Sequence, residues 1–266
     1  MIPRISIIMG IYNCADTLPE AIESILDQTF TDWELIMCDD GSKDNTYEIA
    51  NHYKEKFPDK IVLIKNESNM GLNFTLNHCL QYAKGKYIAR MDGDDISLPA
   101  RFEKEIDFLD SHPEYDIVSC PIIYFDEDGD FRIGKGGGEP DINTMARSTP
   151  FCHAPCMVRR EAFQAVEGYT VAENRLRVED WDLWIRMYEK GYRGFNLSEP
   201  LYKMRDDRNA YRRRKMKYRL NEAKVGISAI KKLHLSPINY IYVLRPIIVG
   251  LLPAPVYKVL HRSKIH

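Results

Sequence analysis

The chain has 266 residues, of which 44% are hydrophobic and 29% charged, as in an ordinary folded globular protein and unlike a disordered one. Its length suits one large domain with an appendage. The net charge of −2 hides an asymmetry: residues 201–266 hold 16 Lys and Arg against 3 Asp and Glu, whereas residues 1–200 hold 21 against 36. Such a division indicates that the C-terminal part meets an anionic surface, either a membrane or a nucleic acid.

The N-terminal residues and the cysteines favour a cytosolic protein. Residues 1–11 lack the charged segment and long apolar stretch of a secretory signal. The six cysteines are mostly isolated within apolar runs, which favours reduced thiols over a disulfide framework. Cys152, His153 and Cys156 form a cluster that suits zinc, but no second pair of ligands at suitable spacing completes a four-coordinate site. We therefore expect no zinc site.

The first hundred residues alternate short apolar runs with helical patterns, which is typical of a parallel sheet with crossover helices. We predict strands at residues 5–9, 33–38, 61–64 and 87–91. The connecting helices are predicted to run from a cap at Asp16 or Thr17 to residue 26, from a cap at Asp44 or Asn45 to residue 57, and over 73–83.

The remaining elements follow in a less regular order. They are a helix at 99–112, strands at 117–125 and 131–133, a strand and helix at 157–159 and 160–166, a helix at 179–190, and a strand at 201–204. Residues 134–138 contain four glycines, so we predict a mobile loop there. Beyond residue 204 the pattern predicts a basic helix and then an apolar end broken by prolines.

Three carboxylates follow the fourth strand directly, in Asp92-Gly93-Asp94-Asp95. In open α/β sheets, ligands bind beyond the carboxyl ends of the strands. Carboxylates this close repel one another unless a cation or hydrogen-bond donors offset their charge, and Mg²⁺ or Mn²⁺ is the natural partner. Gly93 is expected to let the backbone fold so that Asp92 and Asp94 converge. A solvated acidic turn that caps the next helix is the alternative.

Other nucleotide and metal motifs are absent. The sequence lacks the twelve-residue spacing of an EF-hand, a phosphate-binding P-loop and a Gly-x-Gly-x-x-Gly turn. The phosphates of a bound nucleotide would therefore be held through a metal, which indicates a diphosphate leaving group.

A series of motifs makes the chain resemble the family 2 inverting glycosyltransferases of the GT-A fold, of the bacterial surface-polysaccharide type. The motifs lie at residues 7–13, 39–42, 69–72, 89–95, His153 with 157–159, and 179–184. The resemblance covers roughly residues 3 to 205. It implies an α/β fold with a Rossmann-like, mostly parallel central sheet flanked by helices. Residues 1–204 would form the nucleotide-sugar-binding and catalytic domain, and residues 205–266 a basic helical extension.

The resemblance also assigns residues to the nucleotide. Tyr12, Asn13 and Asp39 would line the base and ribose pocket, and Asn69 would lie near the base. Many relatives carry a histidine shortly after the strand at 201–204, where it helps to bind metal or diphosphate. This sequence has Met-Arg-Asp-Asp-Arg at 204–208 instead. Arg205 or Arg208 is the candidate to neutralise phosphate in its place.

The chemistry is assigned to two pairs of acids. Asp92 and Asp94 match the Asp-x-Asp element, so they would hold the ribose and the metal, Mn²⁺ or Mg²⁺, on the diphosphate. Asp180 matches the carboxylate that deprotonates the acceptor hydroxyl, and Glu179 would support it. Taken alone, Glu179 and Asp180 are equally typical of the first turn of a helix, where negative charge is favourable.

Three further side chains have two interpretations each. Trp181 and Trp184 suit either stacking on a sugar or the hydrophobic core. His153 suits either a contact with substrate or a structural hydrogen bond.

The C-terminal region suits a membrane surface better than a membrane span. Residues 205–219 include eight Lys and Arg, and residues 238–260 are mostly apolar but interrupted by Arg245 and prolines. This pattern favours an element lying in the interface of an anionic membrane. No RNA- or DNA-binding motif accompanies the charge, so we expect no nucleic acid partner. A solvated basic helix packed on the acidic domain is the alternative.

The sequence therefore predicts an inverting glycosyltransferase, cytoplasmic and peripheral on the inner face of the membrane. The donor would be a nucleotide diphosphate sugar, with UDP favoured by the resemblance, and the acceptor a hydroxyl of a glycan or a lipid-linked glycan. The alternatives are a sugar-phosphate nucleotidyltransferase, whose glycine-rich N-terminal turn is missing at residues 10–13, and a non-catalytic nucleotide-sugar-binding protein.

Overall fold

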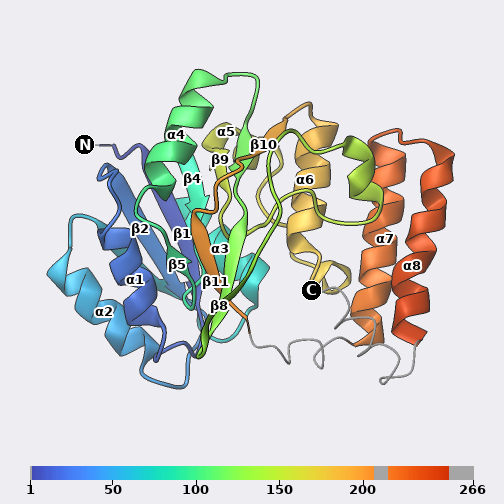
Figure 1. Ribbon diagram of the computed structural model, residues 1–266. Coiled ribbons are helices and arrows are strands. Elements are labelled where there is room, and N and C mark those ends of the chain that lie inside the picture. The colour runs from blue at the N-terminus through green and yellow to red at the C-terminus, as the bar shows by residue number, and fades with distance from the viewer. Residues whose placement is uncertain (1, 207–214, 252–266) are drawn as a thin grey trace. The chain divides into compact units, whose positions relative to one another are not determined.

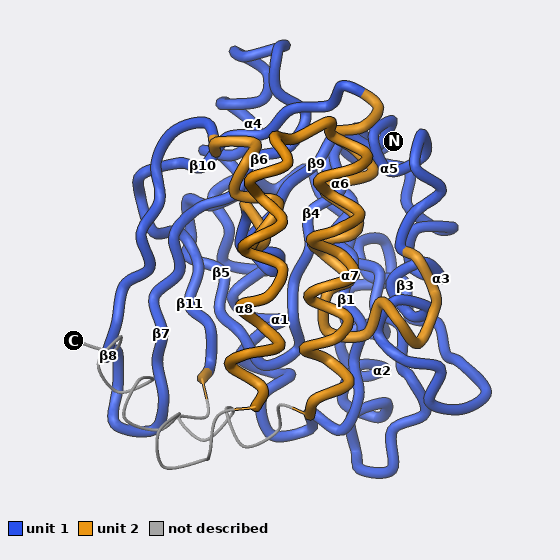
Figure 2. The backbone as a smooth tube through the Cα atoms, turned by 90° about the vertical axis from the view of Figure 1, so that its right-hand side faces the viewer, with its two compact units in different colours: residues 1–139, 151–169, 191–205 blue, residues 140–150, 170–190, 206–266 orange. Residues whose placement is uncertain are grey.

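The structure is a computed structural model that describes residues 2–206 and 215–251 (Figure 1). The chain divides into two compact units, coloured separately in Figure 2. Unit 1 comprises residues 1–139, 151–169 and 191–205, and unit 2 comprises residues 140–150, 170–190 and 206–266. The boundary predicted after residue 204 lies one residue from a division between the units, but unit 2 also includes two earlier segments.

Unit 1 is the α/β part of the chain. Its strands are β1 (Ile5–Ile11), β2 (Trp33–Asp39), β3 (Ile61–Lys65), β4 (Tyr87–Arg90), β5 (Ile96–Ser97), β6 (Ile117–Ser119), β7 (Ile122–Asp126), β8 (Gly129–Ile133), β9 (Met157–Arg159), β10 (Gly194–Asn196) and β11 (Tyr202–Arg205). Its helices are α1 (Leu18–Leu26), α2 (Thr46–Lys56), α3 (Leu72–Tyr82), α4 (Arg101–Ser111) and α5 (Arg160–Ala165). Every element predicted before residue 113 is present within two residues of its predicted bounds.

The central sheet has the strand order β10-β6-β9-β4-β1-β2-β3. The neighbours β4, β1, β2 and β3 are parallel, and β9 is antiparallel to both β4 and β6. A second sheet, β5-β11-β7-β8, is mixed. The predicted mostly parallel central sheet is confirmed.

Both faces of the central sheet are covered by helices, which explains why its strands are buried along their length. Successive side chains of a strand point to opposite faces. Ile5, Ile7 and Met9 of β1 belong to the cluster that includes the buried side chains of α1, α2 and α4. On the other face, a Cβ added to Gly10 would lie 3.2 Å from Thr75 of α3.

The strand predicted at residues 117–125 is two strands. β6 belongs to the central sheet and β7 to the second sheet, with Cys120 and Pro121 between them. Pro121 has no N–H to donate to a ladder, so it cannot continue a central strand. The continuous apolar run is explained by burial on both sides of this break, because Val118, Cys120 and Ile122 all belong to one core cluster.

The glycine-rich segment after β8 is anchored by backbone hydrogen bonds. The Gly134 N–H donates to the carbonyl of Ile122 at 2.7 Å, and Gly138 exchanges two bonds with Asn196, at 2.8 and 2.9 Å. A Cβ at Gly136 would lie 2.5 Å from Cγ of Pro121. Close packing, as well as conformational freedom, therefore requires glycine here.

Unit 2 is helical. Its elements are η1 (Ile142–Ala146), η2 (Glu173–Arg175), α6 (Glu179–Glu189), α7 (Met216–Lys232), η4 (Pro237–Asn239) and α8 (Tyr240–Leu251). Trp181 of α6 packs with Met145, Val225 and Ala229, and its indole N–H donates to the Met145 carbonyl at 2.8 Å. Trp181 and Trp184 are both buried, as their interpretation as core residues predicts.

The C-terminal prediction is confirmed in part. A basic helix is present as α7, and Pro246 lies inside the apolar helix α8. Residues 207–214 and 252–266, which carry part of the predicted basic and proline-rich pattern, lie outside the described residues. Among residues 2–206 and 215–251, none of the helices has the length and hydropathy that a bilayer span requires.

We predict that Gly85→Ala lowers the free energy of unfolding by about 1–3 kcal/mol, because a Cβ there would lie 2.5 Å from the backbone nitrogen of Ser6. Gly134→Ala is the matched control, since its nearest contacts lie at the ordinary 3.4 Å. Urea unfolding of both variants measures the difference, and equal stabilities would contradict the inferred backbone clash.

Candidate functional site

The carboxyl ends of β1, β2 and β4 meet at one edge of the central sheet. Ile11 is paired with Asp39 in the register of β1 and β2, and Ile8 of β1 is paired with Arg90 at the end of β4. The predicted binding residues Tyr12, Asn13 and Asp39, and the acidic turn after β4, are therefore brought to the same edge of unit 1.

The turn after β1 is tied to the loop after β2. Asn13 has a left-handed backbone with φ of 48°, which asparagine tolerates better than most residues. Its N–H donates to Oγ of Ser42 at 3.0 Å, and its Oδ1 accepts from the N–H of Lys43 at 2.8 Å. Tyr12, beside it, is 43% exposed. Asn13 thus fixes the loop, and the exposed Tyr12 ring is available to a ligand.

Asp39 and Asp40, at the end of β2, hydrogen-bond to different loops. Asp39 is fully buried and accepts the N–H of Ser42 at 3.3 Å through both carboxylate oxygens. Asp40 accepts the N–H groups of Met70 and Gly71 at 2.8 and 2.9 Å, which holds the loop that carries the exposed Asn69. Sequence reasoning missed this structural role of Asp40.

The acidic turn after β4 gathers three carboxylates. Within the described residues, Asp92, Asp94 and Asp95 are the only His, Cys, Asp or Glu side chains that form a metal-binding group, with one oxygen each within 4.8 Å of the others. Cys152, His153 and Cys156 form no such group in the described part of the chain. His153 instead lies 2.9 Å from the hydroxyl of Tyr169, and burial holds the pKa of its ring well below its ordinary value.

Arg90 is the buried cation of this turn. Its Nη2 donates to Oδ1 of Asp92 at 2.6 Å, and its Nε is buried without a hydrogen-bond partner among the described residues. Asp92 and Asp94 do converge on the two sides of Gly93, although Gly93 itself has no positive φ. A Cβ there would lie 3.0 Å from Sγ of Cys14, so a larger residue at position 93 would need the Cys14 side chain to shift.

Asp95 and Tyr202 complete the turn from the second sheet. The hydroxyl of Tyr202 accepts the Asp92 N–H at 3.2 Å and hydrogen-bonds the side chain of Asp95. Asp95 also accepts the N–H of Arg205 at 2.9 Å. Tyr202 and Asp95 were not predicted as site residues, and because they are 107 positions apart in the chain there is no local signal of their contact.

The charge of the turn is not balanced by its protein neighbours. Burial, followed by repulsion from Asp92 and Asp94, raises the pKa of Asp95 to about 8. Burial and repulsion from Asp92 also raise the pKa of Asp94. The guanidinium groups of Arg90 and Arg205 lower the pKa of Asp94, but its net shift is still upward. An oxygen-rich site with excess negative charge and one exposed member fits a hard divalent cation.

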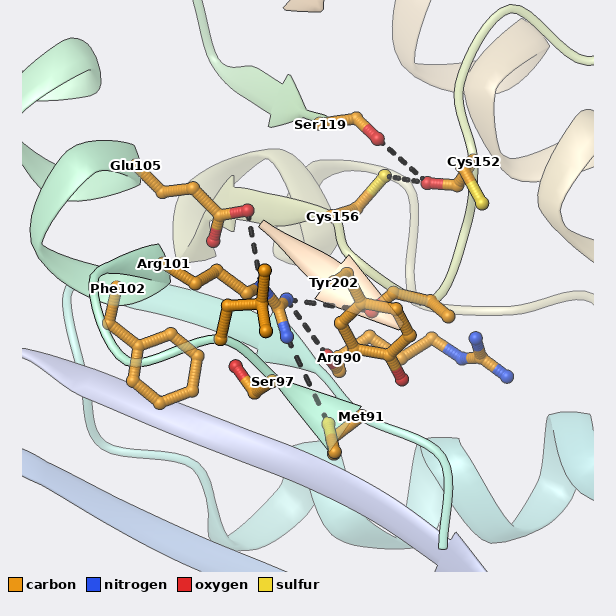
Figure 3. Close-up of polar contacts among 12 residues, drawn as sticks. Arg90, Met91, Ser97, Arg101, Phe102, Glu105, Ser119, Cys152, Cys156 and Tyr202 are labelled. Carbon is orange, nitrogen blue, oxygen red and sulfur yellow. Dashed lines mark hydrogen bonds and ion pairs between the residues drawn. The ribbon is translucent and has the colours of Figure 1, made fainter. Parts of the chain in front are cut away.

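A second buried arginine contacts Arg90 and Met91, the two residues that precede the turn (Figure 3). Arg101 of α4 is fully buried, donates through Nη2 to the carbonyl of Arg90 at 3.0 Å, and lies 5.0 Å from the ring centre of Tyr202. Glu105 accepts from its Nε at 3.2 Å, while the other Glu105 oxygen has no partner among the described residues. Burial raises the pKa of Glu105 to about 7.

Arg205, predicted to face phosphate, does lie at the acidic turn. Its Nε donates to the carbonyl of Asp94 at 3.2 Å and its Nη2 to Glu20 at 2.6 Å. Its guanidinium also lies 4.5 Å from the ring centre of Phe125. The other candidate, Arg208, lies outside the described residues.

The predicted catalytic acids begin α6 of unit 2. Glu179 and Asp180 are half-buried in its first turn. Asp182 in the same turn is engaged by Arg175 at 2.6 Å and Arg186 at 2.9 Å. These two pairs hold the Asp182 carboxylate in place.

Comparison with known proteins identifies relatives over the whole chain. The family model described as Glycosyl transferase family 2 matches residues 6–166. EpsE of Bacillus subtilis (strain 168), assigned by its name as a glycosyltransferase, is 45% identical over 265 residues, which cover 99% of this chain and 95% of EpsE. WfaP of Escherichia coli, a UDP-Glc:alpha-D-GlcNAc-diphosphoundecaprenol beta-1,3-glucosyltransferase, is 32% identical over 203 residues, which cover 75% of this chain and 77% of WfaP.

A solved structure matches this chain over nearly its whole length. It is the mannosyltransferase PcManGT from Pyrobaculum calidifontis in complex with GDP-Man and Mn²⁺, with a TM-score of 0.66 and 18% identity, covering 99% of this chain and 80% of that one. At this identity the likeness shows the fold alone. The predicted GT-A fold is confirmed.

We predict that, in the presence of EDTA, wild-type protein loses stability as the pH rises from about 4 to about 8, and that Asp95→Asn loses less. The folded pKa of Asp95 is about 8 and its ordinary value is 3.8. Between these values the folded state keeps a proton that the unfolded state has lost, so stability falls with rising pH.

The measurement is urea unfolding of both proteins at pH 5 and pH 8. The gap between them should widen by at least about 1 kcal/mol in favour of the variant. Asp59→Asn, at an exposed position, is the control and should follow the wild type. An equal change in the free energy of unfolding between pH 5 and pH 8 for wild type and Asp95→Asn would contradict the inferred burial of this acid.

Proposed function

This chain belongs to glycosyl transferase family 2 and is a glycosyltransferase, and from that premise we propose that it is an inverting enzyme acting on a UDP-sugar. The acceptor is a hydroxyl of a glycan or of a lipid-linked glycan. WfaP, a relative at 32% identity, uses UDP-Glc and a diphosphoundecaprenol-linked sugar, which supports both parts of the proposal. Membership of the family sets aside the nucleotidyltransferase and the non-catalytic binding protein.

The observation that carries the donor site is the group of three carboxylates at the end of β4. Asp92 and Asp94 would hold the ribose and the cation, Mn²⁺ or Mg²⁺. Arg90 keeps Asp92 oriented through the bond of 2.6 Å. The similar mannosyltransferase structure contains Mn²⁺, which supports a divalent cation as the cofactor. Such a cation stabilises the negative charge that develops on the departing diphosphate.

The nucleoside would lie along the neighbouring strand ends. Tyr12 offers an exposed ring for the base, and the fully buried Asp39 lies at the same edge, where it holds Ser42. Asn69 lies in the loop that Asp40 holds, which supports its assignment near the base. Arg205 lies beside Asp94, where a guanidinium would neutralise part of the diphosphate charge once the sugar has left.

Asp180 is the proposed general base. In the transfer, the acceptor hydroxyl gives its proton to the Asp180 carboxylate while its oxygen attacks the anomeric carbon. The bond from that carbon to the diphosphate breaks, and its electron pair leaves with the diphosphate. The first turn of α6 favours negative charge at Asp180, and Glu179 adds to the field that attracts the proton.

The location that accords with this function is the inner face of the membrane, with the chain bound peripherally through its C-terminal region. A lipid-linked acceptor is held at the bilayer, so an enzyme bound there meets it in two dimensions. The excess of cations after residue 200 supports attraction to anionic lipid.

We predict that Asp180→Asn lowers the rate of sugar transfer by about 10²–10⁴-fold, since proton abstraction contributes about that much. Binding of UDP, measured as a shift in melting temperature, should persist because the donor residues are intact. Glu189→Gln, in the last turn of the same helix, is the control and should retain activity. Near-normal turnover by Asp180→Asn would exclude it as the base.

We predict that EDTA abolishes transfer and that added Mn²⁺ or Mg²⁺ restores it. Asp94→Asn should weaken Mn²⁺ binding, measured by calorimetry without substrate, by about tenfold or more, because it removes one of three carboxylate ligands. The control Asp59→Asn removes the same negative charge at an exposed position and should bind Mn²⁺ as the wild type does. Full activity in EDTA would contradict the metal site.

A further inference from the structure

The helices α7 and α8 form a hairpin that lies side by side in both views (Figures 1 and 2). One side of α7 packs on α6 through Val225 and Ala229. A second side packs on α8, where Ala223 and Ile230 meet Val243. A Cβ at Gly226 would lie 3.5 Å from Val243, and one at Gly250 would lie 3.0 Å from Met216, so the two helices run antiparallel in close contact.

The outer side of α8 exposes an apolar stripe. Ile241, Leu244, Ile248 and Leu251 are 62%, 55%, 57% and 71% exposed. Their spacing of three, four and three residues keeps them within about 80° of arc on the helix. These are large side chains in one row, which distinguishes them from scattered apolar residues on an ordinary surface.

The third side of α7 carries a row of lysines. Lys217, Lys224 and Lys231 are seven residues apart and exposed. Leu220, which is 44% exposed, and Ile227 lie between them on the same side. Among the described residues, neither Lys224 nor Lys231 has a carboxylate partner, whereas Arg219 pairs with Glu222 and Lys232 with Glu189.

The two rows face the same side of the hairpin. At 100° per residue, the lysine row lies about 110° clockwise from the α8-facing side of α7, seen from the start of α7. The stripe lies about 110° clockwise from the α7-facing side of α8, seen from the start of α8. Because the helices are antiparallel, these two rotations, each seen from the start of its own helix, place the lysine row and the stripe on the same side of the hairpin. We call this side the hairpin face.

We propose that the hairpin face docks in the interface of an anionic lipid bilayer. The stripe of α8 would enter the boundary between head groups and acyl chains, and the lysines of α7 would contact phosphate groups. An apolar row flanked by cations is the pattern of interfacial helices. This inference rests on the proposed function for its meaning, because a lipid-linked acceptor lies in the same bilayer.

Charge argues against a second copy of the chain as the occupant. Residues 215–251 hold seven Lys and Arg and one Glu. A symmetric dimer would place the same patch against itself and bring these lysines together. Anionic lipid offers the complementary charge to the lysines and an apolar medium to the stripe.

The test is co-sedimentation of the full chain with vesicles of phosphatidylglycerol and phosphatidylcholine, against vesicles of phosphatidylcholine alone. Wild-type protein should bind the anionic vesicles, and binding should weaken with added salt. The double variant Leu244→Gln with Ile248→Gln should bind at least about tenfold more weakly. The triple variant Lys217→Glu, Lys224→Glu and Lys231→Glu should lose the preference for phosphatidylglycerol.

Matched controls separate this proposal from folding and from catalysis. Ile2→Gln with Ile133→Gln also removes two exposed isoleucines, but outside the hairpin face, and should bind vesicles as the wild type does. All variants should keep the wild-type melting temperature. Release of UDP from a UDP-sugar in vesicle-free solution should be unchanged in the stripe variant, so that failure of the proposed function and failure of the docking surface give different results.

Three outcomes would overturn the proposal. The first is wild-type protein that stays in the supernatant with anionic vesicles. The second is a stripe variant that binds them like the wild type. The third is a wild-type dimer, seen by light scattering, that the stripe substitutions separate into monomers, because the stripe would then belong to a contact between copies.

Discussion

Three carboxylates lie in one turn of this protein, and a buried guanidinium and fixed hydrogen-bond donors hold them in position. Arg90 is the last residue of a buried strand, and its Nη2 donates to Oδ1 of Asp92, two residues further on, at 2.6 Å. Arg90 is held in turn by Arg101, which bonds its carbonyl and is itself paired with the fully buried Glu105. A buried ion pair is a costly element and contributes little net stability. Here it fixes the position of a charged turn, which is a requirement of the site rather than of the fold.

The loops after β1 and β2, where the nucleotide is proposed to bind, are also held in place by polar contacts. Polar residues at the strand ends hold loops as well as offering groups to a ligand. Asn13 joins the first two loops, and Asp40 joins the loop after β2 to the loop before α3. These bonds are made to backbone N–H groups, so they set the direction of each loop before any ligand is bound. Tyr12 and Asn69 are thereby left exposed on loops of fixed shape.

What could be predicted from the sequence is what local pattern determines. The strands and helices before residue 113, and the acids at the strand ends, follow from periodicity and from the turn composition. The break at Pro121 was missed because the residues on both sides of it are buried and apolar. Arg101 and Glu105, four residues apart on a helix, have the spacing of a solvent-exposed pair, and only the fold buries them. The bonds of Tyr202 to the acidic turn join residues more than a hundred positions apart, for which a single sequence carries no signal.

The excess of cations in the C-terminal region illustrates the same limit. A count of charges does not distinguish a helix whose cations are neutralised within the protein from one that presents them outward. In the structure both kinds occur on one helix: Arg219 and Lys232 have carboxylate partners, and Lys224 and Lys231 have none among the described residues. The unpaired lysines alternate with Leu220 and Ile227 and share a side with the stripe of α8. A helix that only balanced the charge of an acidic domain would not need the exposed Leu220 between its lysines. Apolar area left in water is unfavourable in proportion to its size, and for this reason we propose that lipid covers the hairpin face.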